Sequence, residues 1–544
     1  MKKAIGLFLV LVCVASFAAA QQTLTIVVFP FENRSASSDL GWISEAFSEV
    51  LSTRLAGRGR FIIERKERNK AYQQLGVPPD AILTLASEYK VAQILGVDWA
   101  IVGSFKVTGQ QMTAETQLLD MHGLRMSPPI RESGALSQLV RIQTLLAWRV
   151  LASYDKSFSV VTEQDFLDTF PPLRLDAFEN YIRGILATDA NSKVQFLTAA
   201  AGLNPPDHRA AFALGEYYFH QKDYQDSAIW ISKLDPKDAN YLTALFLRGV
   251  DNFMLGQNKE SESAFLALSK QIPLNEVWNN LGVLEARRAD YKDALASFER
   301  AFAGDSSDPE YAYNVGVCYC DLKEYRSGAE YLEKALRKSP DGLAVRTMLA
   351  YALRQEGDSA ASQAQLEWVA EHDGSSMADL NTSILPQPRL KKTFNGAAFR
   401  MLAVAVNNSL ESELEKLPPK EHGQVHLERG EQFIKQGRYP EAIRELTEAL
   451  SLIPASVEAQ LSLGQAYELN GQHRKALAQF RASLALNDNA VTHLWMAHAY
   501  LSLHQTSKAL SQCRDALSLD PGNTDANNLM NSIERQEQNL RKDP

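Results

Sequence analysis

The sequence lacks most features that mark a catalytic or nucleic-acid-binding protein. Acidic residues outnumber basic ones, 65 against 56, so the net charge is −9 and the basic footprint needed for nucleic acid is missing. The chain has no G-x-x-x-x-G-K-[ST] loop, no G-x-S-x-G turn and no calcium-binding loop. We therefore expect a protein that is not an enzyme, with no catalytic residue, no cofactor, no metal and no nucleic-acid partner.

Long hydrophobic runs are also missing after residue 20, so no transmembrane segment is predicted. The first 20 residues differ. Lys2 and Lys3 precede an apolar run over 4–17, and residues 18–20 are all alanine. This pattern is typical of a secretory signal peptide. We expect cleavage between Ala20 and Gln21 and an exported protein, with the periplasm as its expected location.

Cysteine is scarce, with four in the whole chain, and beyond the signal peptide an odd number remains, which cannot form a complete disulfide framework. Cys318 and Cys320 lie two apart on a predicted helix and point to different faces, and with Cys513 they suit core positions. His422 and His426 have the i, i+4 spacing of helical zinc sites, but glycine follows the first where the zinc motif has glutamate. We expect structural cysteines and histidines.

Residues 22–157 show the strand and helix pattern of a small α/β domain. Asp39 is predicted to cap its first helix. From Met112 to Leu118 apolar and polar residues alternate, so one face of that strand is expected to be exposed. The predicted strands cover 23–31, 60–65, 98–107 and 111–119, and the predicted helices cover about 39–55, 67–75, 80–95 and 136–154.

The order of these elements, with VVFPFENRS near the start and DWAIVGSFKVTGQQMTAETQLLD near the end, resembles the N-terminal domain of TolB. It is similar too to the related FlgO-like and curli-secretion envelope domains. The resemblance implies a location in the cell envelope and contact with other proteins, and it brings no catalytic centre. Residues 158–174 then lose periodicity and carry Pro171-Pro172, which predicts a linker.

From about residue 175 the sequence repeats every 33 or 34 residues. Each unit has a small residue at the same place, followed by large apolar residues, alanines and often a terminal proline. This is the pattern of tetratricopeptide repeats, in which two helices pack closely at the small residue and units stack into a solenoid. The resemblance implies a right-handed superhelix of helix pairs. The small residues are Gly215, Gly249, Gly282, Gly316 and Ala350, then, after an interruption, Gly430, Gly464 and Ala497.

The expected fold is thus an α/β domain followed by an all-α solenoid. We expect seven parts: a signal peptide (1–20), the TolB-like domain (22–157), a linker (158–174), a first repeat block (175–370), a non-repeat connector with one helix (371–420), a second repeat block (421–522) and a C-terminal capping helix (523–544).

Tetratricopeptide proteins usually bind extended peptides or helices in a concave groove lined by the first helix of each unit. This resemblance predicts an exported adaptor that binds proteins or peptides of the cell envelope. Two alternatives stay open: a module whose α/β domain senses a small molecule, and a secreted hydrolase that recruits substrate through the repeats. The predicted lining is mixed in character, without a ring of Lys and Arg: Phe246, Phe253, Asn279, Tyr313, Val317, Tyr351, Arg354, Leu461, Gln465 and Glu468.

Overall fold

The computed structural model describes residues 23–542 apart from 58, 79–80, 82, 155–157, 159–160, 171–172, 237, 273 and 374–384. The predicted signal peptide and its cleavage site lie outside the described residues. The chain forms two compact units, one of Met1–Leu175 with Phe399–Pro544 and one of Asp176–Ala398. Within the described residues, no helix is both long enough and apolar enough to cross a membrane.

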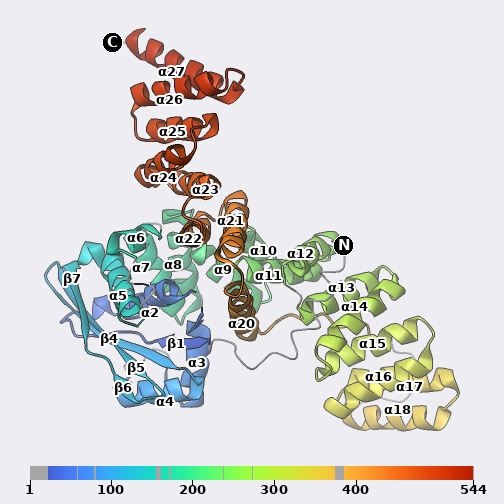
Figure 1. The fold of residues 1–544 in the computed structure, drawn as a ribbon. Helices are drawn as coiled ribbons and strands as arrows, with labels where there is room; N and C mark the ends of the chain where they lie inside the picture. The colour runs from blue at the N-terminus through green and yellow to red at the C-terminus, as the bar shows by residue number, and fades with distance from the viewer. Residues whose placement is uncertain are drawn as a thin grey trace. The chain divides into compact units, whose positions relative to one another are not determined.

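The N-terminal domain is built on a mixed sheet (Figure 1). The central strand β1 runs parallel to β3 and β4, and β4 forms an antiparallel hairpin with β5. The strands follow the order β3-β1-β4-β5-β6, while β2 pairs with β4 and β7 pairs with β5. Their bounds are β1 (Leu24–Val28), β2 (Glu32–Asn33), β3 (Arg60–Ile63), β4 (Trp99–Thr108), β5 (Gln111–Asp120), β6 (Arg125–Met126) and β7 (Ile130–Ala135).

Burial along the strands agrees with the pattern in the sequence. Ile26, Val27 and Val28 are all buried, so both faces of β1 are covered. In β5 the residues from Met112 to Leu118 alternate between buried and exposed or half-buried, as predicted. The helices of this domain are α2 (Trp42–Leu55), α3 (Arg65–Gln74), α4 (Leu85–Leu95) and α5 (Leu139–Tyr154), with α6 (Glu163–Asp168) after them.

Two local predictions in this domain were wrong. Asp39 does not cap α2, because a short 3-10 helix, η1 (Ser38–Leu40), precedes it and Ser37 accepts the hydrogen bond at its start. Helix α4 begins at Leu85 rather than near residue 80, since the Thr84 hydroxyl accepts from the Ser87 amide. The structure also adds β2, β6, β7 and α6, which are short or polar and carry little apolar periodicity.

The rest of the described chain is helical and is organised as paired helices. The unit Asp176–Ala398 holds α7 (Leu175–Leu186), α8 (Ala190–Leu203), α9 (Arg209–His220), α10 (Tyr224–Ile231), α11 (Tyr241–Met254), α12 (Asn258–Ser269), α13 (Asn275–Arg287), α14 (Tyr291–Gly304), α15 (Pro309–Asp321), α16 (Tyr325–Lys338), α17 (Leu343–Glu356) and α18 (Ser359–Asp373). The C-terminal part holds α20 (Gly396–Leu414), α21 (Pro419–Lys435), α22 (Tyr439–Leu452), α23 (Val457–Leu469), α24 (His473–Leu486), α25 (Ala490–Ser502), α26 (Thr506–Leu519) and α27 (Thr524–Lys542). The predicted α/β domain followed by a helical solenoid is confirmed.

The repeated glycines lie where paired helices touch. A Cβ atom added at Gly249 would come within 2.6 Å of the Phe265 ring, and one at Gly464 within 2.4 Å of the Phe480 ring. Such separations are shorter than carbon contacts in folded proteins, so a side chain at either glycine would push the facing ring aside. The same arrangement recurs at Gly215, Gly282, Gly316 and Gly430, each against a large residue 16 positions later.

Replacing Gly282 with alanine is expected to lower the free energy of unfolding by about 1–2 kcal/mol, because the new methyl group would lie 2.7 Å from Phe298. Gly202 is the matched control: it is also helical, but a Cβ there meets nothing within 4 Å. Gly202→Ala should stabilise the chain by about 0.5–1 kcal/mol through helix propensity alone. Urea denaturation of both variants checks this. Equal effects would contradict the packing role of Gly282.

Candidate functional site

An extended stretch of the chain itself lies against the first repeat block. Residues 385–395 have no regular secondary structure and lead into α20 (Figure 1). Their polar contacts run to α13 and α15, the first helices of two successive pairs. We call residues 385–394 the groove segment. It shows directly how the first helices of this block can hold an extended peptide.

Three asparagines bind the backbone of the groove segment. The side chain of Asn314 accepts from the Arg389 amide at 2.7 Å and donates to the Arg389 carbonyl at 2.8 Å. Asn280 does the same at Lys391, accepting at 2.8 Å and donating at 2.9 Å. Asn279 donates to the Arg389 carbonyl at 3.0 Å and accepts from Asn314 at 2.7 Å. All three side chains are fully buried, so each depends on these partners for its hydrogen bonds.

The asparagine side chains bond to the backbone of the segment in the way that a neighbouring β-strand would. Each of two asparagines satisfies the N–H and the C=O of one residue, and the residues they bind, Arg389 and Lys391, are two apart. Pro386 and Pro388 fall on the alternate positions, where no backbone donor is used, so their missing N–H groups cost nothing. The geometry requires an extended backbone and places no demand on the side chains it anchors.

Side chains add a second layer of contacts, beginning at Tyr313. Its hydroxyl donates to the Gln387 carbonyl at 3.2 Å, and the Arg389 guanidinium lies 4.4 Å from the centre of its ring. Burial raises the pKa of Tyr313 to about 12, with Arg389 acting in the opposite direction. The phenol therefore keeps its proton, donates a hydrogen bond and offers its face to a cation.

Lys391 makes the strongest charged contacts of the segment. Its Nζ atom lies 2.7 Å from Asp308 Oδ2 and 2.6 Å from Glu310 Oε2, at the N-terminus of α15. Tyr311 lies beneath the ammonium group, 5.2 Å away. Burial lowers the pKa of Lys391, but hydrogen bonds from the ammonium to both carboxylates outweigh it and raise the pKa overall. The groove thus holds a charged lysine between two acids.

Apolar side chains of the segment fill the remaining surface. Leu390 packs on the cluster formed by α13–α15, and Leu385 packs on the next cluster, which includes Tyr313 and Val317. The Phe394 ring lies 4.8 Å from the Phe246 ring on α11. The segment therefore contacts units from α11 to α17, and its three apolar side chains are half-buried there.

The structure places four of the predicted groove residues beside the segment. Asn279 and Tyr313 bond to it, Phe246 touches its terminal ring, and Val317 belongs to the cluster under Leu385. Phe246, Asn279, Tyr313 and Val317 are almost fully buried, so they also hold neighbouring helices together.

The other predicted positions of this block lie differently. Phe253 packs under the Arg287 guanidinium at 3.7 Å, and the Tyr351 ring packs edge-on against Tyr325 at 6.0 Å. Arg354 is exposed. Phe253 packs on the same cluster as Leu390, and Tyr351 packs on the same cluster as Leu385. The predicted role of all three residues as partner contacts stays a prediction.

The predicted positions in the second block show internal packing. Glu468 is nearly buried and accepts from His473 Nδ1 and the Ser502 hydroxyl, both at 2.8 Å. Leu461 packs into the core of the following units, and Gln465 is half-buried. Asparagine is also missing here: the residues two before Gly430, Gly464 and Ala497 are Glu428, Ser462 and Trp495. The asparagine anchors thus distinguish the first block.

Sequence reasoning missed five groove residues: Asn280, Asn314, Asp308, Glu310 and Tyr311. One signal was available for the first two. Asn280 and Asn314 are 34 residues apart, which is one repeat. Each stands two positions before the glycine that recurs in the repeats, on an otherwise apolar helix face. Asparagine is unfavourable at a buried helical position unless its amide finds partners. The acids could not be found without knowing where Lys391 lies.

Among the residues that the structure describes, two groups have the donor atoms to hold a metal ion. In the first, His426 Nδ1 lies 2.8 Å from Glu445, and its Nε2 lies 3.0 Å from His422 Nε2, with Glu411 nearby. A hydrogen bond from His426 to Glu445 and one from His422 to His426 account for this arrangement without an ion. In the second group, His208 binds Asp238 at 2.8 Å, beside Asp235.

The cysteines are core residues, as predicted. Cys318, Cys320 and Cys513 are free and buried. Burial raises the pKa of Cys318 and of Cys320 to about 12, so both stay protonated thiols and are poor nucleophiles. The fourth cysteine, Cys13, belongs to the predicted signal peptide and lies outside the described residues.

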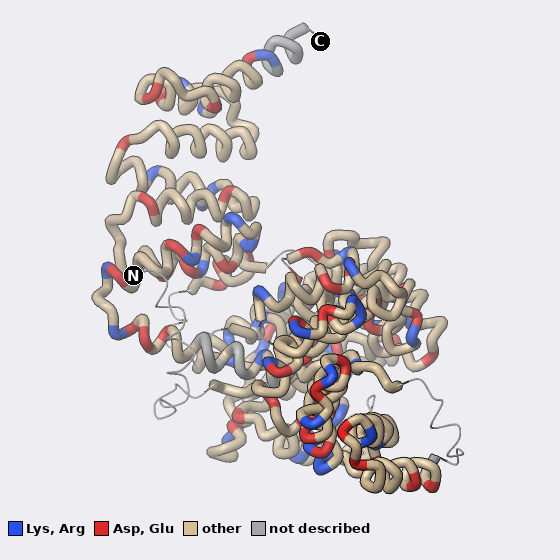
Figure 2. The backbone as a smooth tube through the Cα atoms, turned by 90° about the vertical axis from the view of Figure 1, so that its right-hand side faces the viewer, with Lys and Arg blue, Asp and Glu red and all other residues tan. Residues whose placement is uncertain are grey.

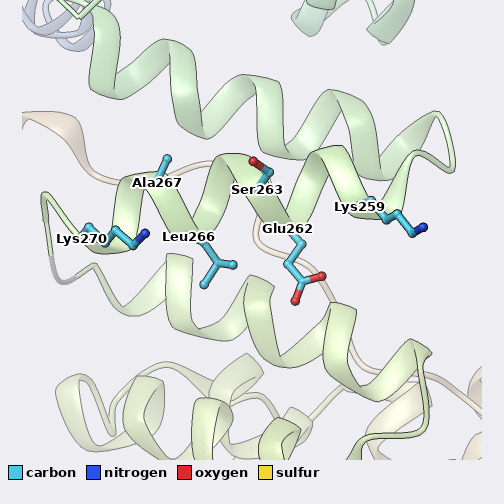
Figure 3. Close-up of a pocket in the computed structure, with 6 residues that line it drawn as sticks. All are labelled: Lys259, Glu262, Ser263, Leu266, Ala267 and Lys270. Carbon is cyan, nitrogen blue, oxygen red and sulfur yellow. The ribbon is translucent and has the colours of Figure 1, made fainter.

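A surface hollow in the first repeat block is poorly shaped to hold a small molecule. Figure 3 shows a shallow hollow on α12 whose six lining residues come from that helix and its C-cap, so they do not converge on one point. Figure 2 shows acidic and basic residues interspersed along the repeat helices. This mixed charge agrees with the absence of a basic stripe in the sequence.

Comparison with known families identifies the repeats. Models of the tetratricopeptide repeat match residues 189–241 and 279–342 in the first block, and 430–471 and 457–489 in the second. The tetratricopeptide repeats expected from the sequence are therefore confirmed. The matched region 279–342 contains all three asparagines of the groove.

Individual relatives are distant. The chain is 22% identical over 255 residues to Hsp70-Hsp90 organizing protein 1 of Glycine max, spanning 46% of this chain and 42% of that protein. Among solved structures, MamA of Desulfovibrio magneticus RS-1 is 17% identical, with a TM-score of 0.29, covering 31% of this chain and 96% of that one. The first TPR of Spaghetti (RPAP3) bound to HSP90 peptide SRMEEVD is 23% identical, with a TM-score of 0.21, covering 22% and 95%. The chain thus spans less than half of the first relative's length.

Proposed function

We propose that this protein is a protein-interaction scaffold of the cell envelope whose first repeat block binds extended peptide segments of its partners. The observation that carries the proposal is the bidentate pairing of Asn280 and Asn314 with a peptide backbone. Main-chain bonds of this kind give affinity for any extended chain, and flanking pockets give specificity. The tetratricopeptide matches and the similarity to Hsp70-Hsp90 organizing proteins support a scaffold that is not an enzyme.

A library of displayed linear peptides tests this function. The bait is the full chain carrying Lys391→Glu, which sets a third acid against Asp308 and Glu310 and should free the groove. The matched bait adds Asn280→Ala and Asn314→Ala. We expect linear peptides that bind the first bait and bind the second about 10–100-fold more weakly, since several buried hydrogen bonds are lost. Peptides that bind both baits equally, or no enrichment at all, would contradict the proposal.

Export is the second part of the proposed function. It rests on the first 20 residues and on the resemblance of residues 22–157 to TolB-like envelope domains. We expect the protein expressed in a bacterial host to begin at Gln21 and to be released with the periplasmic fraction. Mass spectrometry of the intact chain measures this directly. A mature chain that retains Met1 or Lys2 would contradict export by this signal.

A further inference from the structure

The groove segment has the position of a ligand, yet it belongs to the same chain. Its backbone is held by buried asparagines, its lysine by two acids, and its arginine by an aromatic face. A free peptide bound in this way would be regarded as specifically recognised. A partner must therefore replace these contacts to reach the same asparagines.

We propose that the groove segment is a built-in competitor that mimics the partner, and that the partner is an extended peptide of another protein with basic residues two positions apart. This inference rests on the proposed function. It adds the chemical class of the peptide that the groove binds and a way in which that binding is regulated. The spacing follows from the two anchored residues, Arg389 and Lys391.

The charge preference follows from the surroundings of those two positions. At the second position Asp308 and Glu310 both lie within 2.7 Å of the ammonium nitrogen, so an acidic side chain there would face two carboxylates. At the first, the face of Tyr313 attracts a guanidinium and repels an anion. Between them Leu390 enters an apolar cluster. The expected motif is therefore basic–apolar–basic in an extended chain, with proline tolerated at the alternate positions before it.

Tethering sets the strength of the competition. The segment is held at one end by α20 and follows α18 after residues 374–384, so it stays near the groove. An effective concentration of about 1 mM, against an intrinsic dissociation constant of about 100 µM for a short peptide, would weaken a partner about tenfold. A tethered competitor of this strength would prevent weak ligands from binding, whereas tight or multivalent ligands would still displace it.

The test uses a labelled synthetic peptide, LPQPRLKKTF, which copies residues 385–394. A second peptide has glutamate in place of the arginine and of the first lysine. Both are titrated by fluorescence anisotropy against the full-length chain, the Lys391→Glu chain and the Lys392→Glu chain. Lys392 is the matched control, because it carries the same charge next to Lys391 but is exposed.

We expect the basic peptide to bind Lys391→Glu about tenfold more tightly than it binds either the unmodified chain or Lys392→Glu. Lys391→Ala serves as the second variant if circular dichroism shows lost helix in the first. Equal binding to all three chains would overturn the competitor role. Equal binding of basic and acidic peptides to Lys391→Glu would overturn the ligand class while the groove function stands. No binding of either peptide to any chain would overturn both.

Discussion

Trypsin should cut the Asn314→Ala variant within the groove segment about five- to tenfold faster than it cuts the unmodified chain. Asn314 makes two of the three hydrogen bonds to the Arg389 backbone, and removing its side chain also takes away a donor to Asn279. Loss of buried hydrogen bonds worth about 1–3 kcal/mol lowers the equilibrium constant for the bound segment about 5–150-fold. Because an effective concentration about tenfold above the dissociation constant leaves about a tenth of the unmodified chain released, the released population rises about five- to tenfold. The segment carries trypsin sites at Arg389, Lys391 and Lys392.

The position of these sites makes the assay specific. Residues 374–384 contain no Lys or Arg, so a cut in the region 374–392 reports on the segment alone. The control variant is Asn531→Ala, at an exposed position of α27, which should leave the rate unchanged. Helical content of both variants is compared first by circular dichroism. An Asn314→Ala chain that is folded and resists trypsin as the unmodified chain does would contradict the anchoring role.

Asp251→Asn is expected to stabilise the first repeat block by about 2–4 kcal/mol at pH 8 and by little near pH 4. Asp251 is fully buried on α11; its Oδ2 accepts from the Ser227 hydroxyl, while Oδ1 has no hydrogen-bond partner. Burial raises its pKa to about 7, against the lowering effect of the Ser227 hydrogen bond. One pKa unit corresponds to about 1.4 kcal/mol, which sets the size of the effect.

The sign follows from proton linkage. With a folded pKa near 7 and an ordinary unfolded value, the folded chain holds a proton that the unfolded chain has released. The stability of the unmodified chain should therefore fall as the pH rises from about 4 to 7 and stay lower above that. Asparagine is neutral throughout and removes this fall. Urea denaturation at pH 4.5, 6 and 8 measures it, with the exposed Asp293→Asn as control. A constant difference across pH would contradict the assignment to Asp251.

The repeats could be predicted from the sequence because their packing leaves a periodic mark. Each close helix contact requires a small residue, so Gly282 and Gly316 recur at fixed spacing whatever the rest of the unit contains. The α/β strands were predicted for a similar reason, since burial on both faces selects β-branched residues. Edge strand β7 was missed because its sequence, IRESGA, is half polar.

The candidate site was only partly predictable. The groove positions usual in tetratricopeptide repeats predicted Asn279 and Tyr313 as binding residues. The segment that these two residues bind lies about 75–110 positions further along the chain and has no periodic pattern. An extended segment held by side-chain amides leaves no pattern of its own, because its backbone supplies the contacts. Only a three-dimensional arrangement shows that PQPRLKK occupies the groove.

Hydrogen exchange of the unmodified full-length chain tests the central claim most directly. The claim is that the first repeat block holds an extended backbone through Asn280 and Asn314. It predicts that the amides of Arg389 and Lys391 exchange at least about tenfold more slowly than those of an unstructured chain, because both donate to buried oxygens. Exchange of these two amides at the unstructured rate, while α13 and α15 remain protected, would contradict the claim.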